Sequence, residues 1–273
     1  MYETIDHWVS IAALAVMAVF CVRMIRGGLV GDFPLSLERA ASLHEDSVMV
    51  AVLAYLLGAM LFSGVAGAFF QNPQDVRSGL LVGNGAQIVG LIACLLIASK
   101  RFTGGARRFI FGSALGRGQL PIKTMLSLAV LALGFCPLVR DGTVVVVRSV
   151  AKGYEFPVHP TIAALGQEGV GWFAVVTLWI GASVIAPMAE EAFFRGILQT
   201  FLFNIVGSRR VAIVLASLAF GLVHFQQPQA IPALVVLGMI LGYAYERSSA
   251  LIVPVTIHAV FNLKTLIWFA GAA

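Results

Sequence analysis

Residues 170–206 have the sequence VGWFAVVTLWIGASVIAPMAEEAFFRGILQTFLFNIV, and this stretch decides the fold class. It is far longer than the roughly 20 apolar residues that one membrane-spanning helix needs. Its only ionisable side chains, Glu190, Glu191 and Arg195, follow shortly after Pro187. Because proline removes a backbone donor and crowds the preceding turn, we expect Pro187 to kink this helix or to divide it into a span and a shorter helix.

Seven further apolar stretches are typical of membrane helices. The stretch at 211–225 is short for a full crossing, so we expect it to be tilted or to end inside the bundle. The sequence therefore predicts an all-α fold, a polytopic transmembrane bundle of about eight helices. The seven stretches are 7–25, 46–70, 78–99, 121–139, 211–225, 229–245 and 250–270.

The composition agrees with a membrane protein and excludes other classes. Hydrophobic residues make up 59% of the chain and charged residues 11%, whereas soluble domains have about 45–50% and roughly 25%. The net charge of +5 comes from residues in short loops rather than a basic stripe, so no nucleic-acid partner is expected. Cys21, Cys94 and Cys136 each lie inside an apolar run, which argues against a disulfide framework.

The distribution of Lys and Arg predicts the orientation. The first seven residues contain no Lys or Arg, so we interpret 7–25 as a retained membrane helix rather than a signal peptide. With the N-terminus outside, the inner loops hold twelve of the 18 basic residues and the outer loops hold four. The excess on the inner side is typical of cytoplasmic loops and predicts an outside N-terminus with an even number of crossings. We expect a multi-pass protein of the plasma (inner) membrane.

The charged cluster after Pro187 divides into a paired and an unpaired acid. Glu191 and Arg195 are four residues apart and share a helix face, with the acid on the favourable N-terminal side. Glu190 lies about 100° around the helix and has no such partner. An unpaired carboxylate in a membrane cavity suits a general base. The alternative is that the three residues form only a charge network that holds the helix in place.

Two further motifs place polar side chains in apolar helices. His258 and Asn262 are four residues apart, which places the imidazole and the amide on one helix face, and Phe220 and His224 have the same spacing. Alone, His224 could be bonded to a carbonyl, and the pair of His258 and Asn262 could be polar contacts between helices. Counted from the inner helix ends at 1.5 Å per residue, Glu190, His224, His258 and Asn262 all lie about 12–24 Å deep. We therefore expect one site in a common layer.

Water-mediated amide hydrolysis is the reaction that this set of side chains favours. A carboxylate and an imidazole can deprotonate a water, and a second imidazole and an amide can donate to the oxyanion that forms. No nucleophilic side chain accompanies the motifs, since Ser183 and Ser217 are isolated.

At these motifs the sequence resembles the CPBP family, which includes the CaaX prenyl endopeptidases and the abortive-infection proteins. The family pattern of Glu-Glu-x-x-x-Arg, Phe-x-x-x-His and His-x-x-x-Asn occurs here in order, within roughly 170–265. The resemblance implies an intramembrane glutamate endopeptidase whose cavity opens to the cytoplasm. It implies that Glu190 and His224 activate water, that His258 and Asn262 form the oxyanion hole, and that Glu191, Arg195 and Phe220 support them.

The domain organisation follows from this resemblance. Residues 1–140 hold N-terminal transmembrane helices of unassigned role, and residues 141–169 form an extramembrane or interfacial connection. Residues 170–273 form the catalytic helical core. The expected partners are membrane lipids and a membrane-anchored protein or peptide substrate.

Three alternatives remain open at this point. Glu190, His224 and His258 could ligate zinc as a two-histidine, one-carboxylate set, although the resemblance implies a metal-free mechanism without a cofactor. The chain could instead be a non-enzymatic membrane scaffold or immunity-type protein. Buried Glu and His also occur in proton-coupled transporters, but these often contain inverted repeats, and none is evident here.

Overall fold

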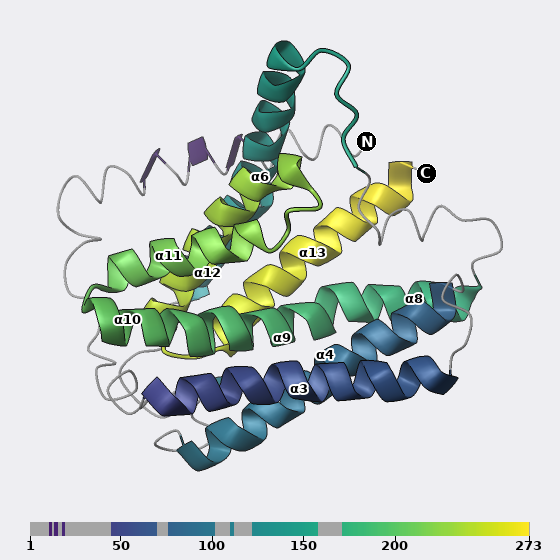
Figure 1. Ribbon diagram of the computed structural model, residues 1–273. Helices are drawn as coiled ribbons and strands as arrows, with labels where there is room; N and C mark the ends of the chain where they lie inside the picture. The colour runs from purple at the N-terminus through teal and green to yellow at the C-terminus, as the bar shows by residue number, and fades with distance from the viewer. Residues whose placement is uncertain are drawn as a thin grey trace.

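A computed structural model describes residues 45–69, 76–101, 110–111, 122–157 and 171–272, with six isolated positions between Ile11 and Val19. Within these residues all regular structure is helical and no strand occurs (Figure 1). The N-terminal elements are α3 (Glu45–Phe69), α4 (Val76–Arg101) and α6 (Ile122–Val150). The C-terminal elements are α8 (Trp172–Ile180), η1 (Gly181–Ile185), α9 (Ala186–Glu191), η2 (Ala192–Gln199), α10 (Thr200–Val206), α11 (Arg209–Leu222), η3 (Pro228–Ala230), α12 (Ile231–Ser248) and α13 (Ile252–Ala272).

The described helices form an all-α polytopic bundle, and the chain is an integral membrane protein. Five helices are long and apolar enough to cross a membrane, and Ile252–Trp268 is a shorter apolar helix. The predicted stretch 211–225 corresponds to the short helix α11. The predicted helix at 7–25 lies outside the described residues except for isolated helical positions, so the expected number of eight stays a prediction.

The elements from α8 to α10 form one continuous helix, called here the long helix, over Trp172–Val206. In Figure 1 it runs across the bundle, with α3 and α4 on one side and α11, α12 and α13 on the other. Pro187 does not divide it. The backbone instead takes a π-helical register over Gly181–Ile185, directly before the proline.

Helix α6 is longer than the sequence predicts. It continues through Arg140 and Asp141 to Val150, and its end projects beyond the other helices at the top of Figure 1. The first ten residues of the predicted connection 141–169 are therefore helical. The predicted helix ends at 139, whereas the observed helix continues past Arg140 and Asp141, whose side chains pair with each other at 2.8 Å on the helix surface. The three-part division of the chain stays a prediction.

Helix α12 occupies the centre and contacts α6, α11, α13 and the long helix. A polar seam joins it to the long helix, formed by Glu191, Arg195 and Gln199 on one side and Gly238, Gly242 and Glu246 on the other. Each set has the four-residue spacing that places its members on one helix face. The Arg195 guanidinium donates to the Gly238 carbonyl at 3.2 Å, and the Gln199 amide donates to the Gly242 carbonyl at 3.2 Å and to Glu246 at 2.9 Å. Gly242 leaves room for the Gln199 amide, because a Cβ atom at this position would lie 2.7 Å from Gln199 Oε1.

We expect Gly238→Ala to destabilise the protein by about 1–3 kcal/mol, as overpacked cores do. A Cβ atom at this position would lie 2.9 Å from the Cβ and 3.0 Å from the Cα of Ser217 on α11. Gly142→Ala is the matched control, because no described atom lies within 4 Å of its Cβ and alanine should stabilise an open helical position by about 0.5–1 kcal/mol. Thermal unfolding in detergent measures both, and equal effects would contradict the close packing.

Candidate active site

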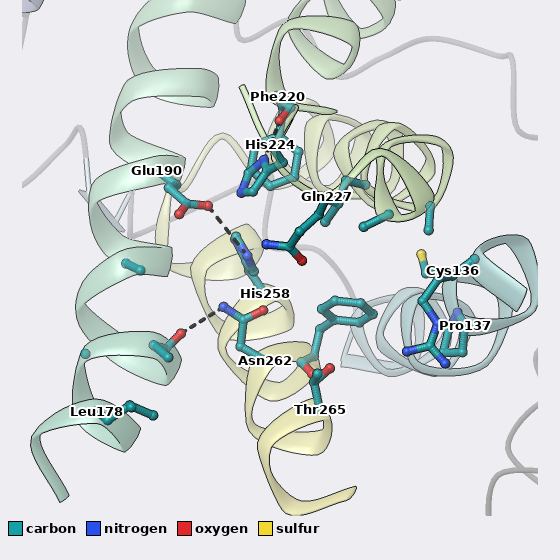
Figure 2. Close-up of a pocket in the computed structure, with 18 of the residues that line it drawn as sticks. Cys136, Pro137, Leu178, Glu190, Phe220, His224, Gln227, His258, Asn262 and Thr265 are labelled. Carbon is teal, nitrogen blue, oxygen red and sulfur yellow. Dashed lines mark hydrogen bonds and ion pairs between the residues drawn. The ribbon is translucent and has the colours of Figure 1, made fainter. Parts of the chain in front are cut away.

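One cavity of about 540 Å³ brings the sequence motifs together. Its lining includes Glu190 of the long helix, Phe220 and His224 at the end of α11, and His258 and Asn262 of α13. Figure 2 shows Glu190, His224, His258 and Asn262 directed toward a common space. Residues of α4, α6 and α12 complete the wall.

Glu191 and Arg195 are turned away from this space and pair with each other. The Arg195 Nε atom lies 3.0 Å from Glu191 Oε2, and the exposed fractions of the two side chains are 1% and 0%. The guanidinium also lies over the Phe220 ring, 4.6 Å from its centroid. The pair is therefore fully desolvated and held at one end by the polar seam.

His258 is anchored by Glu191, a contact that the motif spacing does not reveal. Its Nδ1 atom lies 2.8 Å from Glu191 Oε1. Because an ionised carboxylate can only accept, Nδ1 carries the hydrogen. The other ring nitrogen, Nε2, then points to the cavity, where it lies 3.8 Å from Glu190 Oε2 (Figure 2). Glu190 is the more accessible carboxylate, with 28% of its side chain exposed.

His224 lies in the turn that follows α11 and not within the helix. In a continuing α-helix the backbone N–H of His224 would donate to the Phe220 carbonyl, but here it donates to the Gly221 carbonyl. The ring Nδ1 of His224 pairs with the Phe220 carbonyl instead, at 2.8 Å. A carbonyl only accepts, so Nδ1 again carries the hydrogen and Nε2 has a lone pair. The imidazole thus caps the end of α11 and keeps a free acceptor.

Asn262 reaches across to the long helix. Its Nδ2 atom donates to the Ala182 carbonyl at 2.8 Å, which fixes the orientation of the amide because a carbonyl cannot donate. Ala182 and Asn262 both line the cavity.

Phe220 is fully buried and packs against both histidines. Its ring centroid lies 5.3 Å from that of His224 and 5.7 Å from that of His258, both edge to face. These contacts hold the two imidazoles at one end of the cavity and carry no chemistry of their own.

Several polar lining residues were not singled out by the motif analysis. They could have been found as polar side chains at membrane depth: Asn84 and Gln87, for example, are three residues apart in the otherwise apolar α4. The Gln87 Oε1 atom is buried and has no hydrogen-bond partner among the described residues. The additional polar lining residues are Asn84, Gln87, Arg140, Gln227, Gln229 and Thr265.

The zinc alternative has limited geometric support. In the part of the chain that the structure describes, no three His, Cys, Asp or Glu residues are close enough to hold a metal ion. The expectation of a metal-free site stays a prediction. What faces the cavity is a carboxylate, two imidazole Nε2 atoms and a carboxamide.

The segment that carries these residues is similar to known proteases. Residues 172–264 match the family model described as type II CAAX prenyl endopeptidase Rce1-like. Over 85 residues the chain is 38% identical to the membrane-embedded CAAX protease MroQ of Staphylococcus aureus (strain USA300). That match covers 29% of the present chain and 34% of the relative, so the chain spans about a third of the relative's length. No solved structure matches.

Proposed function

Because its segment 172–264 matches the family model described as type II CAAX prenyl endopeptidase Rce1-like, and part of the chain is similar to a membrane-embedded CAAX protease, we propose that this chain is an intramembrane endopeptidase. It hydrolyses peptide bonds of membrane-anchored proteins or peptides by attack of an activated water. The observation that carries the proposal is the convergence of Glu190, His224, His258 and Asn262 on one cavity within a membrane bundle.

Glu190 and His224 are the groups that activate the water. Arg195 bonds Glu191 rather than Glu190, and the Glu190 carboxylate faces the His258 ring, with 3.8 Å between Oε2 and Nε2. His224 offers a lone pair at Nε2 because its Nδ1 hydrogen is bonded to a neutral carbonyl. Both can accept a hydrogen bond from a water between them, and the carboxylate takes its proton as the water oxygen attacks the substrate carbonyl.

His258 and Asn262 stabilise the oxyanion. His258 can donate from Nε2 only as the imidazolium, because its Nδ1 hydrogen is already bonded to Glu191. In that form Nε2 faces the cavity and the Glu190 carboxylate, whose Oε2 lies 3.8 Å away.

The reaction then closes without a covalent enzyme intermediate. The tetrahedral adduct expels the amine as the C–N bond breaks, and Glu190 returns its proton to the leaving nitrogen. The products are a carboxylic acid, which keeps the second hydrogen of the water, and an amine; they exchange a proton to become carboxylate and ammonium, and Glu190 is again ionised. The Asn262 amide holds the oxyanion in the meantime, as preorganised donors do in amide hydrolysis.

The substrate enters from the cytoplasmic side in this proposal. The support is the excess of Lys and Arg in the inner loops, which is typical of cytoplasmic loops. A membrane-anchored peptide would bring its scissile bond to the depth of Glu190 without leaving the bilayer.

The proposal is tested by cleavage in liposomes of a panel of prenylated and unprenylated membrane-anchored peptides, with mass spectrometry of the products. We expect at least one peptide to be cut once, and the rate to be unchanged by a chelator. Loss of cleavage with the chelator and its return with zinc would replace the mechanism by a zinc-dependent one. A well-folded protein that cuts none of the peptides would favour the alternative that the chain is a non-enzymatic membrane scaffold.

A further inference from the structure

The backbone of the long helix changes register just before Pro187. In the π-helical segment Gly181–Ile185 a carbonyl pairs with the N–H five residues later, and the Ala186 N–H donates to the Gly181 carbonyl in this way. The next donor in that register would be the nitrogen of Pro187, which has no hydrogen. The Ala182 carbonyl is therefore left without a backbone donor.

Asn262 of α13 supplies the missing donor. Its Nδ2 atom lies 2.8 Å from the Ala182 oxygen (Figure 2), and Ala182 and Asn262 both line the cavity. One amide hydrogen is used in this bond, which fixes the plane of the carboxamide. The second hydrogen lies about 120° away from it by the planar geometry of the amide, and no acceptor for it occurs among the described residues.

The same relation occurs a second time on α13. Pro137 lies inside α6 and deprives the Leu133 carbonyl, four residues earlier, of its helical donor. Lys264 Nζ donates to that carbonyl at 3.2 Å. Side chains two residues apart on α13 thus donate to carbonyls that prolines have freed on two different helices. These hydrogen bonds connect α13 to the long helix and to α6.

We propose that Pro187 and the Ala182 carbonyl form a positioning device for Asn262. The proline leaves a carbonyl free at the cavity wall, and the carbonyl orients the carboxamide so that its second N–H faces the reacting oxygen. The catalytic consequence of this device rests on the proposed function, whereas the hydrogen bond itself does not.

Pro187→Ala restores an N–H at residue 187 and gives the Ala182 carbonyl a backbone donor. The Asn262 amide then loses its fixed orientation. We expect kcat for a peptide that the wild type cuts to fall about tenfold to a hundredfold, as misplaced catalytic groups do, with KM changed less than about twofold. The unfolding midpoint should stay the same or rise, since alanine is a far better residue inside a helix than proline. Unchanged kcat would overturn the positioning role.

A double-mutant cycle on thermal unfolding tests the device without any substrate. Asn262→Ala strands the Ala182 carbonyl in the wild type but not in Pro187→Ala, where the new N–H can pair with it. We expect the decrease in unfolding midpoint caused by Asn262→Ala to be at least halved in the Pro187→Ala background. Additive effects of the two substitutions would contradict the coupling.

Pro254→Ala is the matched control for the cycle. Pro254 is also fully buried, but it lies in the first turn of α13, where the missing N–H costs no helical bond. The effect of Asn262→Ala should be the same in this background as in the wild type. If the wild type cuts no peptide, the proposed function fails, and the unfolding cycle still decides whether Pro187 and Asn262 are coupled.

Discussion

Glu190→Gln is expected to lower kcat for peptide cleavage by about 10²–10⁴-fold, the usual contribution of a general base. The amide keeps the shape of the carboxylate but cannot take a proton from water. Folding should be little affected, because the contact of Glu190 with His258 Nε2 is long, at 3.8 Å, and 28% of the Glu190 side chain is exposed. Initial rates on a peptide that the wild type cuts, with the unfolding midpoint measured in parallel, give both quantities.

Glu155→Gln is the control for this experiment. Glu155 is exposed beyond the end of α6, so the same change there should leave both the rate and the midpoint at the wild-type values. A Glu190→Gln protein that cuts as fast as the Glu155→Gln control would remove Glu190 from the mechanism.

Arg195→Met is expected to destabilise the protein by about 3–5 kcal/mol, the usual cost of removing one partner of a buried ion pair. Glu191 has an exposed fraction of 0% and would lose the cation that lies 3.0 Å away. The Gly238 carbonyl would lose its donor as well. The expected result is a large decrease in the thermal unfolding midpoint in detergent.

Two further variants test whether the loss of stability comes from the buried charge of Glu191 or from replacing an arginine by methionine as such. Arg210 is exposed at the start of α11, so Arg210→Met should change the stability by less than about 0.5 kcal/mol. Adding Glu191→Gln to Arg195→Met should recover part of the lost stability, because no uncompensated charge then remains buried. If Arg195→Met unfolds at the same temperature as Arg210→Met, the polar seam does not stabilise the bundle.

The helices were predictable from the sequence wherever an apolar run was long. The predicted stretch 46–70 corresponds to α3 at Glu45–Phe69, and 78–99 to α4 at Val76–Arg101. The end of α6 was not predictable, because Arg140, Asp141 and Gly142 are typical of a loop in a membrane protein. The helix continues through these three residues to Val150.

The local contacts of the site were also predictable, but the long-range contacts were not. The four-residue spacing of Glu191 and Arg195 predicts that they share a helix face, and the structure places them 3.0 Å apart. The bond between Glu191 and His258 joins residues 67 positions apart, and that between Ala182 and Asn262 joins residues 80 apart. The spacing of residues along one helix cannot predict such contacts, because they depend on how α13 crosses the long helix.

Proline shows the same division between local and tertiary structure. That Pro187 leaves a carbonyl of the preceding turn without a backbone donor follows from the chemistry of the residue, since its nitrogen has no hydrogen. Which group then pairs with the freed carbonyl depends on the neighbouring helix. The structure answers this twice on α13, with Asn262 at Ala182 and Lys264 at Leu133.

The central claim is that a water activated at Glu190 hydrolyses a peptide bond inside the membrane. The most direct measurement is cleavage of a membrane-anchored peptide by the purified protein in liposomes, in ¹⁸O-labelled water and in the presence of a chelator. We expect two complementary fragments, with one ¹⁸O atom in the new carboxylate, and no fragments from Glu190→Gln. Fragments from Glu190→Gln at the wild-type rate, or none from a folded wild-type protein with any peptide of the panel, would contradict the claim.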